Sequence, residues 1–478
     1  MKTSYLPALL CLTLGSQAPG KGVPSNASAN LVLGQSDFVT GTIRPQSSFS
    51  SNRPEGVVID PITGKVFVSE NNANRVLRYA NADALANGAG AEAVFGQQNF
   101  GGPGAVIPLA NSMSGPIGMH FDHKGRLWVC DAYNNRVLMF EAASYASNQP
   151  YPDRVFGQQD FDTNGAGSTS QKMSTPIGVH LDNDDRLWVA DTGNNRVLYF
   201  NQISSKTNGA AADGVLGQPG FGTSNFGNTN ATMSGPYSVT VSSNGAVFVA
   251  DSSNNRVLRF DNAVGIGNGG AASGVLGQAN FVANASALTA SGMSRPTGVA
   301  LDANGALWVT DYYNERLIRF DKAASAVFGA AAKAVVGQPD FVTNTPAVTE
   351  SGSIFSFCKP CFDPKGNLWI ADTEHFRVLG FPVDATKPTL TVTSLGPVTT
   401  TTSSSTKIRG TAADANGIFI VSYSINGGSK KTATGTTKWN FTVGLSKGLN
   451  TIKIYSVDSV NNASTTKTLK VTRSGAVK

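Results

Sequence analysis

Short apolar segments recur along most of the chain, and glycine, asparagine, serine and proline separate them. One stretch has apolar segments at 116–122, 127–130 and 136–140, and a fourth around 155–158. These segments are rich in valine, leucine and aromatic residues and are too short for typical helices. An Asp-x-x-Asn-Asn sequence, typical of a turn, separates the second from the third. The pattern therefore predicts a unit of four short β-strands.

This unit repeats about every 60 residues. A Gly-Gln pair preceded by two apolar residues marks each fourth strand, at Gly34, Gly96, Gly157, Gly217, Gly277 and Gly337. An arginine that begins each third strand keeps the same spacing, at Arg75, Arg136, Arg196, Arg256, Arg316 and Arg377. Repeats of four strands are the units of β-propellers, so we expect an all-β, six-bladed β-propeller over residues 30–383.

The two ends of the repeat region complement each other. Residues 31–38 have the pattern of a fourth strand but precede the first complete unit, whereas no such strand follows the third strand at 377–381. We expect the N-terminal strand to complete the last blade. Closing the ring in this way removes exposed strand edges.

The repeated sequence resembles a known family. The pattern Pro-x-Gly-Val…Asp…Gly…Trp/Phe-Val-x-Asp…Asn-Asn-Arg-Val-Leu-x-Phe, as in 116–140, is similar to the NHL repeat. The Val-Leu-Gly-Gln-x-x-Phe strand and the long period resemble those of secreted bacterial NHL-repeat proteins. The resemblance implies a propeller, but one propeller scaffold supports unrelated activities.

Residues that recur in every unit are expected to be structural, because a catalytic group rarely needs six copies. We expect the aromatic residues of the second strands to pack between blades: Phe67, Trp128, Trp188, Phe248, Trp308 and Trp369. The recurring acids should bind the repeated arginines: Glu70, Asp131, Asp191, Asp251, Asp311 and Asp372. Met113, Met173, Met233 and Met293 are expected to pack at the rim.

Composition narrows the class of protein further. Charged residues make up 14% of the chain and hydrophobic residues 40%, which argues against a coiled coil and against wholesale disorder. Residues 1–20 contain Lys2, an apolar run at 6–14 and then small residues, the order of a secretory signal peptide. We therefore expect an exported protein, periplasmic, cell-surface or extracellular, without a transmembrane segment.

The composition changes near Lys387, where the repeat ends. Residues 388–475 alternate apolar and polar positions between turn signals, which predicts a β-sandwich. This region resembles the disulfide-free Ig-like modules of bacterial surface proteins. From 385 to 478 there are 12 basic residues against two acids, Asp414 and Asp458, a net charge of +10. Such an excess favours attraction to an anionic surface polymer, although scattered lysines can also serve solubility alone.

Positions that depart from the repeat are the candidates for chemistry. One position of the first strand reads Val58, His120, His180, Thr240, Ala300 and Cys361 around the ring. Imidazole and thiolate are ligands of zinc and copper, so His120, His180 and Cys361 are candidate metal ligands. Packing between blades is the alternative interpretation. Cys358 and Cys361 have the spacing of a redox motif, but they lead into a strand and lack the activating helix, so a local disulfide or two thiols is expected.

The turns between second and third strands vary as well. Aromatic and ionisable residues replace the common glycine or serine at Tyr133, Tyr312, Tyr313, Glu374 and His375. Loops on a rigid scaffold often carry function, and tyrosines can stack on a sugar or a peptide. These five residues are therefore candidates for ligand binding.

Two functions remain open at this point. The first is an exported, non-catalytic binding or scaffold protein that recognises a protein or glycan at the loop face, with the Ig-like region as spacer or anchor and with no cofactor. The second is a metal-assisted enzyme of lyase or lactonase type at the mouth of the channel. Glu55 weakly resembles a metal ligand of propeller lactonases, but the partner ligands of that family have no match here. Nucleic-acid binding is disfavoured by the signal peptide and by the acidic balance of the propeller region.

Overall fold

The computed structural model describes residues 22–102, 109–352, 354, 356–357, 359–414, 417–458, 460 and 462–475. Contacts divide the chain into two compact units, Asn26–Pro382 and Val383–Lys478, the latter grouped with the residues up to Ser25. The predicted signal peptide at 1–20 and Cys358 lie outside the described residues. In the described part of the chain, no helix is long and apolar enough to cross a membrane.

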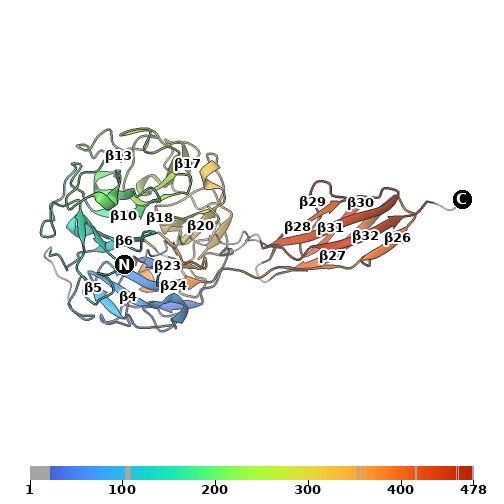
Figure 1. Ribbon diagram of the computed structural model, residues 1–478, viewed down its shortest axis with the longest axis horizontal. Coiled ribbons are helices and arrows are strands. Elements are labelled where there is room, and N and C mark those ends of the chain that lie inside the picture. Colours follow the sequence, from blue (N-terminus) through green and yellow to red (C-terminus); the bar gives the residue numbers. More distant parts are fainter. Residues whose placement is uncertain are drawn as a thin grey trace, which may run out of the picture. The chain divides into compact units, whose positions relative to one another are not determined.

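The unit Asn26–Pro382 is built from repeated four-stranded antiparallel sheets (Figure 1). Five of them follow chain order: β2 (Pro54–Ile59), β3 (Lys65–Glu70), β4 (Arg75–Asn81) and β5 (Ala93–Phe95); β6 (Pro116–Phe121), β7 (Leu127–Asp131), β8 (Arg136–Phe140) and β9 (Arg154–Phe156); β10 (Pro176–Leu181), β11 (Leu187–Asp191), β12 (Arg196–Phe200) and β13 (Gly214–Leu216); β14 (Pro236–Val241), β15 (Val247–Asp251), β16 (Arg256–Phe260) and β17 (Gly274–Leu276); β18 (Pro296–Leu301), β19 (Leu307–Asp311), β20 (Arg316–Phe320) and β21 (Ala334–Val336). The repetition is consistent with a propeller.

One further sheet joins the two ends of this unit. It contains β22 (Cys361–Phe362), β23 (Leu368–Asp372), β24 (Arg377–Phe381) and, from the N-terminal end, β1 (Leu31–Leu33). β1 pairs antiparallel with β24, with Val32 opposite Leu379. The strand is shorter than the expected 31–38, because Asp37 Oδ1 accepts hydrogen bonds from the backbone of Val39 and Thr40 and so forms a turn instead.

The core lies between neighbouring sheets, and the repeated aromatic residues fill it. Trp128 of β7 is fully buried and clusters with Val179 and Leu187 of the following sheet. Its indole Nε1 donates a 3.0 Å hydrogen bond to Asp122 Oδ2, which satisfies the polar atom of this buried ring. Met173 is also fully buried in the same cluster, so it packs inside the core.

The Asp-x-x-Asn-Asn turns form short 3₁₀ helices. The 3₁₀ helices of the described residues are η1 (Ala82–Ala84), η2 (Ala132–Asn134), η3 (Thr192–Asn194), η4 (Ile203–Ser205), η5 (Ser252–Asn254), η6 (Tyr312–Asn314), η7 (Ala323–Ser325) and η8 (Thr373–His375). After η2, Asn135 adopts the left-handed conformation (φ 53°), which asparagine tolerates better than most residues.

The predicted pairing of repeated acids with repeated arginines is present. Asp131 Oδ2 and Arg136 Nε lie 2.7 Å apart, and both side chains are fully buried. The same guanidinium donates to the carbonyl groups of Leu109 and Ser112 in the connection between sheets. Each arginine thus fixes a long connection to its sheet through charge-assisted hydrogen bonds.

The second unit contains two sheets that share one core. One is β25 (Thr389–Val392), β27 (Ser405–Ala413) and β30 (Lys438–Gly444); the other is β26 (Val398–Thr401), β32 (Lys467–Arg473), β31 (Gly448–Asp458), β28 (Ile418–Ile425) and β29 (Lys431–Thr432). Ile408, Trp439 and Ile452 lie in the core. The Thr-rich stretch 389–406 supplies β25 and β26, and β26 pairs in parallel with β32.

Candidate functional site

The first strands of the repeated sheets bring equivalent positions together. β6 contacts both β2 and β10, and β14 contacts both β10 and β18. In Figure 1 the labels of β6, β10 and β18 lie around the middle of this unit, whereas β5, β13 and β17 lie at its periphery. The register gives the six predicted positions the same place in each sheet, opposite the aromatic position of the second strand: Val58 with Phe67, His120 with Trp128, His180 with Trp188, Thr240 with Phe248, Ala300 with Trp308, and Cys361 with Trp369.

Three residues form what we call the histidine cluster: His120, His180 and Lys359. The rings of His120 and His180 have centroids 4.5 Å apart and are tilted by 38°. Lys359 Nζ donates a 3.0 Å hydrogen bond to the carbonyl oxygen of Val179 and lies 3.5 Å from His120 Nδ1. Lys359 comes from the segment before β22, so its side chain joins the last sheet to β6 and β10.

The surroundings of His120 fix its protonation. Its Nε2 lies 3.2 Å from the carbonyl oxygen of Leu181, which can only accept, so Nε2 carries the hydrogen. Nδ1 then faces the ammonium group of Lys359. Burial lowers the pKa of His120 well below its ordinary value, and the charge of Lys359 lowers it further. Burial and Lys359 also lower the pKa of His180.

This arrangement does not fit a transition-metal site. A metal needs a free lone pair on an imidazole nitrogen, but one nitrogen of His120 donates to a carbonyl and the other faces an ammonium group. Among the described residues, the ligand atoms of His120, His180 and Cys361 do not gather within 4.8 Å of one another. Cys361 has a free thiol, and burial raises its pKa to about 11, so the thiolate that binds metal is disfavoured.

A second group, the Glu55 cluster, contains Arg53, Glu55, Tyr312, Phe357 and Glu374. Glu55 is buried, and its Oε1 lies 3.1 Å from Arg53 Nε. Arg53 also lies 3.4 Å from Glu374, and its guanidinium sits 5.0 Å from the ring centroid of Phe357. Burial raises the pKa of Glu55 to about 7, although Arg53 opposes the rise. A carboxyl group with this pKa can both take and give a proton at neutral pH.

Tyr312 extends this cluster to the neighbouring sheet. Its ring lies 4.2 Å from that of Phe357, centroid to centroid. Burial raises the pKa of Tyr312 to about 12; the charge of Glu374 adds to the rise, and those of Arg53 and Arg295 oppose it. Phe357 and Lys359 are two residues apart, so each of the two clusters takes one residue from the same short segment of the chain.

The structure separates the five loop candidates. It brings Tyr312 and Glu374 into the Glu55 cluster and leaves Tyr313 beside it, half exposed, with its ring 5.1 Å from that of Tyr312. His375 turns instead to Asp372, with 2.9 Å between Nδ1 and Oδ2. Tyr133 is exposed in η2, between β7 and β8, and lies over Gly115. Gly115 has a φ of 59°, and a Cβ there would lie 2.5 Å from the Tyr133 ring, so glycine lets this ring lie directly over the backbone.

Arg295 adds a second cation to the same face. Its Nη1 donates a 2.7 Å hydrogen bond to Tyr313 Oη, and its guanidinium stacks 5.3 Å from that ring centroid. Within the described residues, no carboxylate lies within ion-pair distance of Arg295. A partly exposed guanidinium without an acidic partner is suited to bind a carboxylate of a ligand.

Sequence reasoning missed Arg53, Arg295 and Lys359 and left Glu55 without a role. A signal was present, because Arg53 and Arg295 stand directly before the first-strand proline, where other units have Gly115, Thr175 or Gly235. Glu55 likewise follows that proline where two other units have isoleucine, Ile117 and Ile177. The burial that makes these departures chemically relevant could not be read from the sequence.

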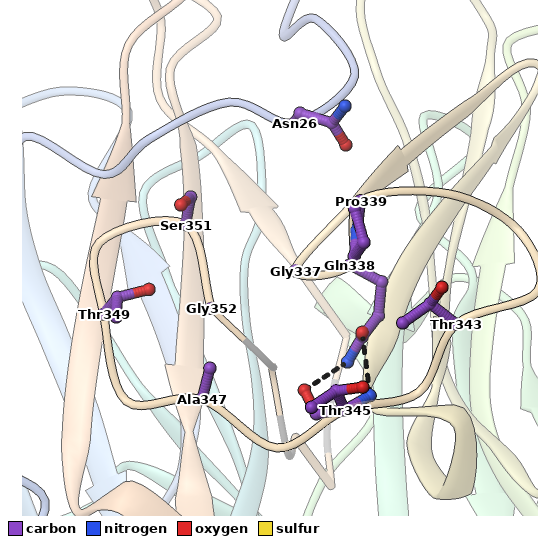
Figure 2. Close-up of a pocket in the computed structure, with 10 residues that line it drawn as sticks. All are labelled: Asn26, Gly337, Gln338, Pro339, Thr343, Thr345, Ala347, Thr349, Ser351 and Gly352. Atoms are coloured by element: carbon purple, nitrogen blue, oxygen red, sulfur yellow. Dashed lines mark hydrogen bonds between the residues drawn. The ribbon is translucent and has the colours of Figure 1, made fainter.

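Among the described residues, two pockets away from both clusters are lined by repeated Gly-Gln pairs. One of about 400 Å³ is lined by hydroxyl, amide and backbone groups around Gly337 and Gln338. Figure 2 shows the Gln338 side-chain amide against the backbone of Thr345. Its Nε2 donates a hydrogen bond to the carbonyl oxygen of Thr345, and its Oε1 accepts one from the Thr345 N–H. A smaller pocket of about 290 Å³ occupies the equivalent place at Gly96 and Gln97. No ionisable side chain lines either pocket, so we assign acid–base chemistry to neither.

Comparison with known proteins supports the repeat. The NHL repeat matches residues 173–200, 233–260 and 293–320. A probable peptidyl-alpha-hydroxyglycine alpha-amidating lyase of Caenorhabditis elegans is 29% identical over 159 residues, which cover 33% of this chain and 41% of that protein. The chain thus spans less than half the length of this curated relative.

Two solved structures are similar at low identity. A virginiamycin B lyase from Staphylococcus aureus is 13% identical, with a TM-score of 0.41, over 71% of this chain and 97% of that one. A protein of unknown function from Bacteroides thetaiotaomicron is 14% identical, with a TM-score of 0.45, over 76% of each chain. Similarities at this level do not bear on function. The chain contains NHL repeats on repeated four-stranded sheets, an arrangement consistent with a β-propeller.

Proposed function

We propose that this chain is an enzyme of lyase type in which Glu55 moves a proton on a small substrate that carries a carboxylate. The observation that carries the proposal is the burial of Glu55, with a pKa of about 7, beside Arg53 and within the cluster of Tyr312 and Glu374. A buried carboxyl group with such a pKa, next to cations on a loop face, is typical of a catalytic site. This proposal replaces the non-catalytic scaffold as the preferred function.

The cluster can hold a substrate in a defined orientation. Arg295 would bind the substrate carboxylate, and the half-exposed ring of Tyr313 beside it would cover the adjoining group. Glu55 would then face the reacting atoms, with the guanidinium of Arg53 stabilising negative charge that develops on an oxygen. Each of these residues is supplied by this chain.

The similarity to a lyase that acts on peptidyl-α-hydroxyglycine suggests a substrate for testing. In such a compound a hydroxyl group and an amide nitrogen share one carbon. Glu55 would take the hydroxyl proton, the C–O bond would become a carbonyl as the C–N bond breaks, and the proton would pass to the departing nitrogen. Atoms and charge balance without an oxidant or a reductant. Opening of a lactone, which would use the same base on water, is the related alternative.

The test is the release of glyoxylate from a short peptide ending in α-hydroxyglycine, measured with the wild type, Glu55→Gln and Glu350→Gln. Glu350 is exposed and lies outside the cluster, so its variant is a matched control. We expect Glu55→Gln to lower kcat about 10²–10⁴-fold, the usual contribution of a general acid or base. Wild-type activity should rise through about pH 7 as Glu55 ionises.

Equal activity of the wild type and Glu55→Gln would overturn the role of Glu55. If neither α-hydroxyglycine peptides nor lactones react with the wild type, the enzyme proposal fails. Binding of a protein or glycan at the loop face would then be the function to test.

We also infer that the repeated sheets are the blades of a six-bladed β-propeller closed by β1, and that residues 388–475 form an Ig-like β-sandwich. The pairing of β1 with β24 supports closure, and the two sheets around one core support the sandwich. Export directed by a signal peptide at residues 1–20 remains part of the proposal.

A further inference from the structure

The unit Val383–Lys478 holds a group of acidic residues that the proposed function does not use. Asp384, Asp414 and Asp458 each direct a carboxylate oxygen to the same place, and these oxygens lie within 4.8 Å of one another. Asp384 precedes β25, Asp414 directly follows β27, and Asp458 ends β31. Only the fold brings them together, since at least 30 residues of sequence separate each from the next.

Two of the three carboxylates are buried with an oxygen that lacks a hydrogen-bond partner. Asp458 is fully buried and Asp384 is 7% exposed. Asp458 Oδ1 accepts from the backbone of Val460 and Asn462, and Asp384 Oδ1 accepts from the backbone of Thr386. Within the described residues, the Oδ2 atom of each has no hydrogen bond and no ion-pair partner. A buried carboxylate oxygen without a partner is costly, so each needs a ligand or a proton.

The three acids lie together although the surrounding sequence is strongly basic. Residues 385–478 contain 12 basic residues and only two acids, and both acids lie here beside Asp384. Both acids of residues 385–478 thus lie beside Asp384, where the three carboxylates repel one another.

We infer that Asp384, Asp414 and Asp458 form a calcium site that fastens the segment before β25 to the ends of β27 and β31. Ca²⁺ binds oxygen ligands at about 2.3–2.6 Å, so two ligands of one ion lie at most about 5 Å apart, as these do. Three carboxylates without histidine or cysteine favour a hard cation over zinc or copper. Mg²⁺ demands a tighter octahedron and keeps more of its water, so it should bind more weakly.

Backbone hydrogen bonds already hold the segment before β25 near the site. The backbone N–H of Asp384 donates to Gly22, and Asn462 Nδ2 donates to the carbonyl oxygen of Asp384, at 3.0 and 3.1 Å. These bonds place the Asp384 backbone beside the chain that follows β31. Calcium would add a link through the side chains and would remove the repulsion between them.

The experiment uses the full chain, freed of metal by a chelator, with CaCl₂, MgCl₂ and ZnCl₂ as separate titrants in calorimetry. The variants are Asp458→Asn and Asp414→Asn, with Asp184→Asn as the control because that carboxylate is 78% exposed. Asparagine keeps the Oδ1 acceptor of Asp458, so the loop at Val460 and Asn462 should still form.

We expect about one Ca²⁺ per chain, bound at least tenfold more tightly than Mg²⁺, in the wild type and in Asp184→Asn. Both site variants should lose at least tenfold in affinity. Without calcium, Asp458→Asn should melt at a higher temperature than the wild type, because one repelling charge is gone; with calcium the order should reverse. If one of the two variants fails to fold, the other decides.

Absence of calcium binding by the wild type would overturn the site and indicate that protons neutralise the carboxylates. Unchanged calcium affinity in both site variants would also overturn it. Neither result would bear on Glu55, because the two sites share no residue.

Discussion

The imidazole rings of His120 and His180 lie 4.5 Å apart on neighbouring first strands, and Lys359 reaches them from the last sheet. Three groups that can carry positive charge thus share one buried space. Burial and the charge of Lys359 keep the pKa of both histidines well below the ordinary value, so both are neutral at neutral pH.

This arrangement predicts that the protein loses stability in acid. The unfolded chain binds protons at these histidines below about pH 6.5, while the folded chain does not, so the free energy of unfolding falls as pH drops below that value. The slope should reach about 1.4 kcal/mol per pH unit for each histidine. Replacing His120 and His180 by the residues found at the same position elsewhere, His120→Ala with His180→Thr, should flatten the dependence between pH 6.5 and 5.

Denaturant unfolding at several pH values measures this slope. His123→Gln is the control, because His123 is exposed in the turn that follows β6. An unchanged slope in the double variant would show that other groups cause the acid sensitivity.

The metal content of the purified protein is the second prediction. Because neither nitrogen of His120 offers a free lone pair, we expect less than 0.1 zinc or copper per chain in elemental analysis, roughly the level of adventitious metal. The variant His120→Ala with His180→Ala should have the same content. About one zinc or copper per wild-type chain, lost in the variant, would restore the metal-site hypothesis and require a different side-chain arrangement.

Ionisation of the buried Glu55 should lower the free energy of unfolding. Its pKa is raised to about 7, so the folded state holds a proton that the unfolded state releases above about pH 4.5, and stability falls as pH rises from 4.5 to 7. Glu55→Gln should therefore be more stable than the wild type above pH 7, by up to about 3 kcal/mol, and equal to it at pH 4. Melting curves at pH 4 and pH 8 test this. A Gln variant that is less stable at pH 8 would contradict the burial of an ionisable Glu55.

The two neighbouring tyrosines should differ in what they contribute. Tyr312 is 9% exposed and packs on Phe357, so Tyr312→Ala should lower the free energy of unfolding by about 3 kcal/mol. Tyr313 is 52% exposed, so Tyr313→Ala should cost less than about 1 kcal/mol but weaken binding of a carboxylate ligand by releasing Arg295. Denaturant unfolding and KM for the peptide substrate separate the two effects. Equal losses of stability would contradict this division.

The basic second unit predicts salt-dependent retention on a polyanion. If its excess of +10 charges attracts an anionic polymer, elution of the full chain from a heparin column should shift to higher salt than expected from its overall charge of +6. Lys430→Glu with Lys431→Glu, both exposed, should elute clearly earlier. The same change at Lys322 and Lys333 of the first unit, also exposed, should have little effect. If the two double variants elute at the same salt concentration, the basic residues of the second unit serve solubility alone.

The sequence by itself determined the repeated architecture. Strand length, the 60-residue period and the Asp–Arg spacing follow from local patterns, so the four strands of each repeat and the Asp131–Arg136 pairing were predictable. The ring position was predictable for the same reason, because equivalent residues of a repeat occupy equivalent places. The short strand β26 was not, since its partner β32 lies about 70 residues away.

Only the tertiary structure decided which of the unusual residues share a site. Glu55, Tyr312 and Glu374 lie in three different repeats, and Asp384, Asp414 and Asp458 in three separate segments. Their chemistry depends on burial and on neighbouring charge, and neither has a local sequence signal. Lys359 is the clearest case, because a lysine in a Cys-Lys-Pro-Cys run indicates nothing about two histidines on other sheets. Proton affinity is set by the surroundings in space, and the fold supplies those surroundings.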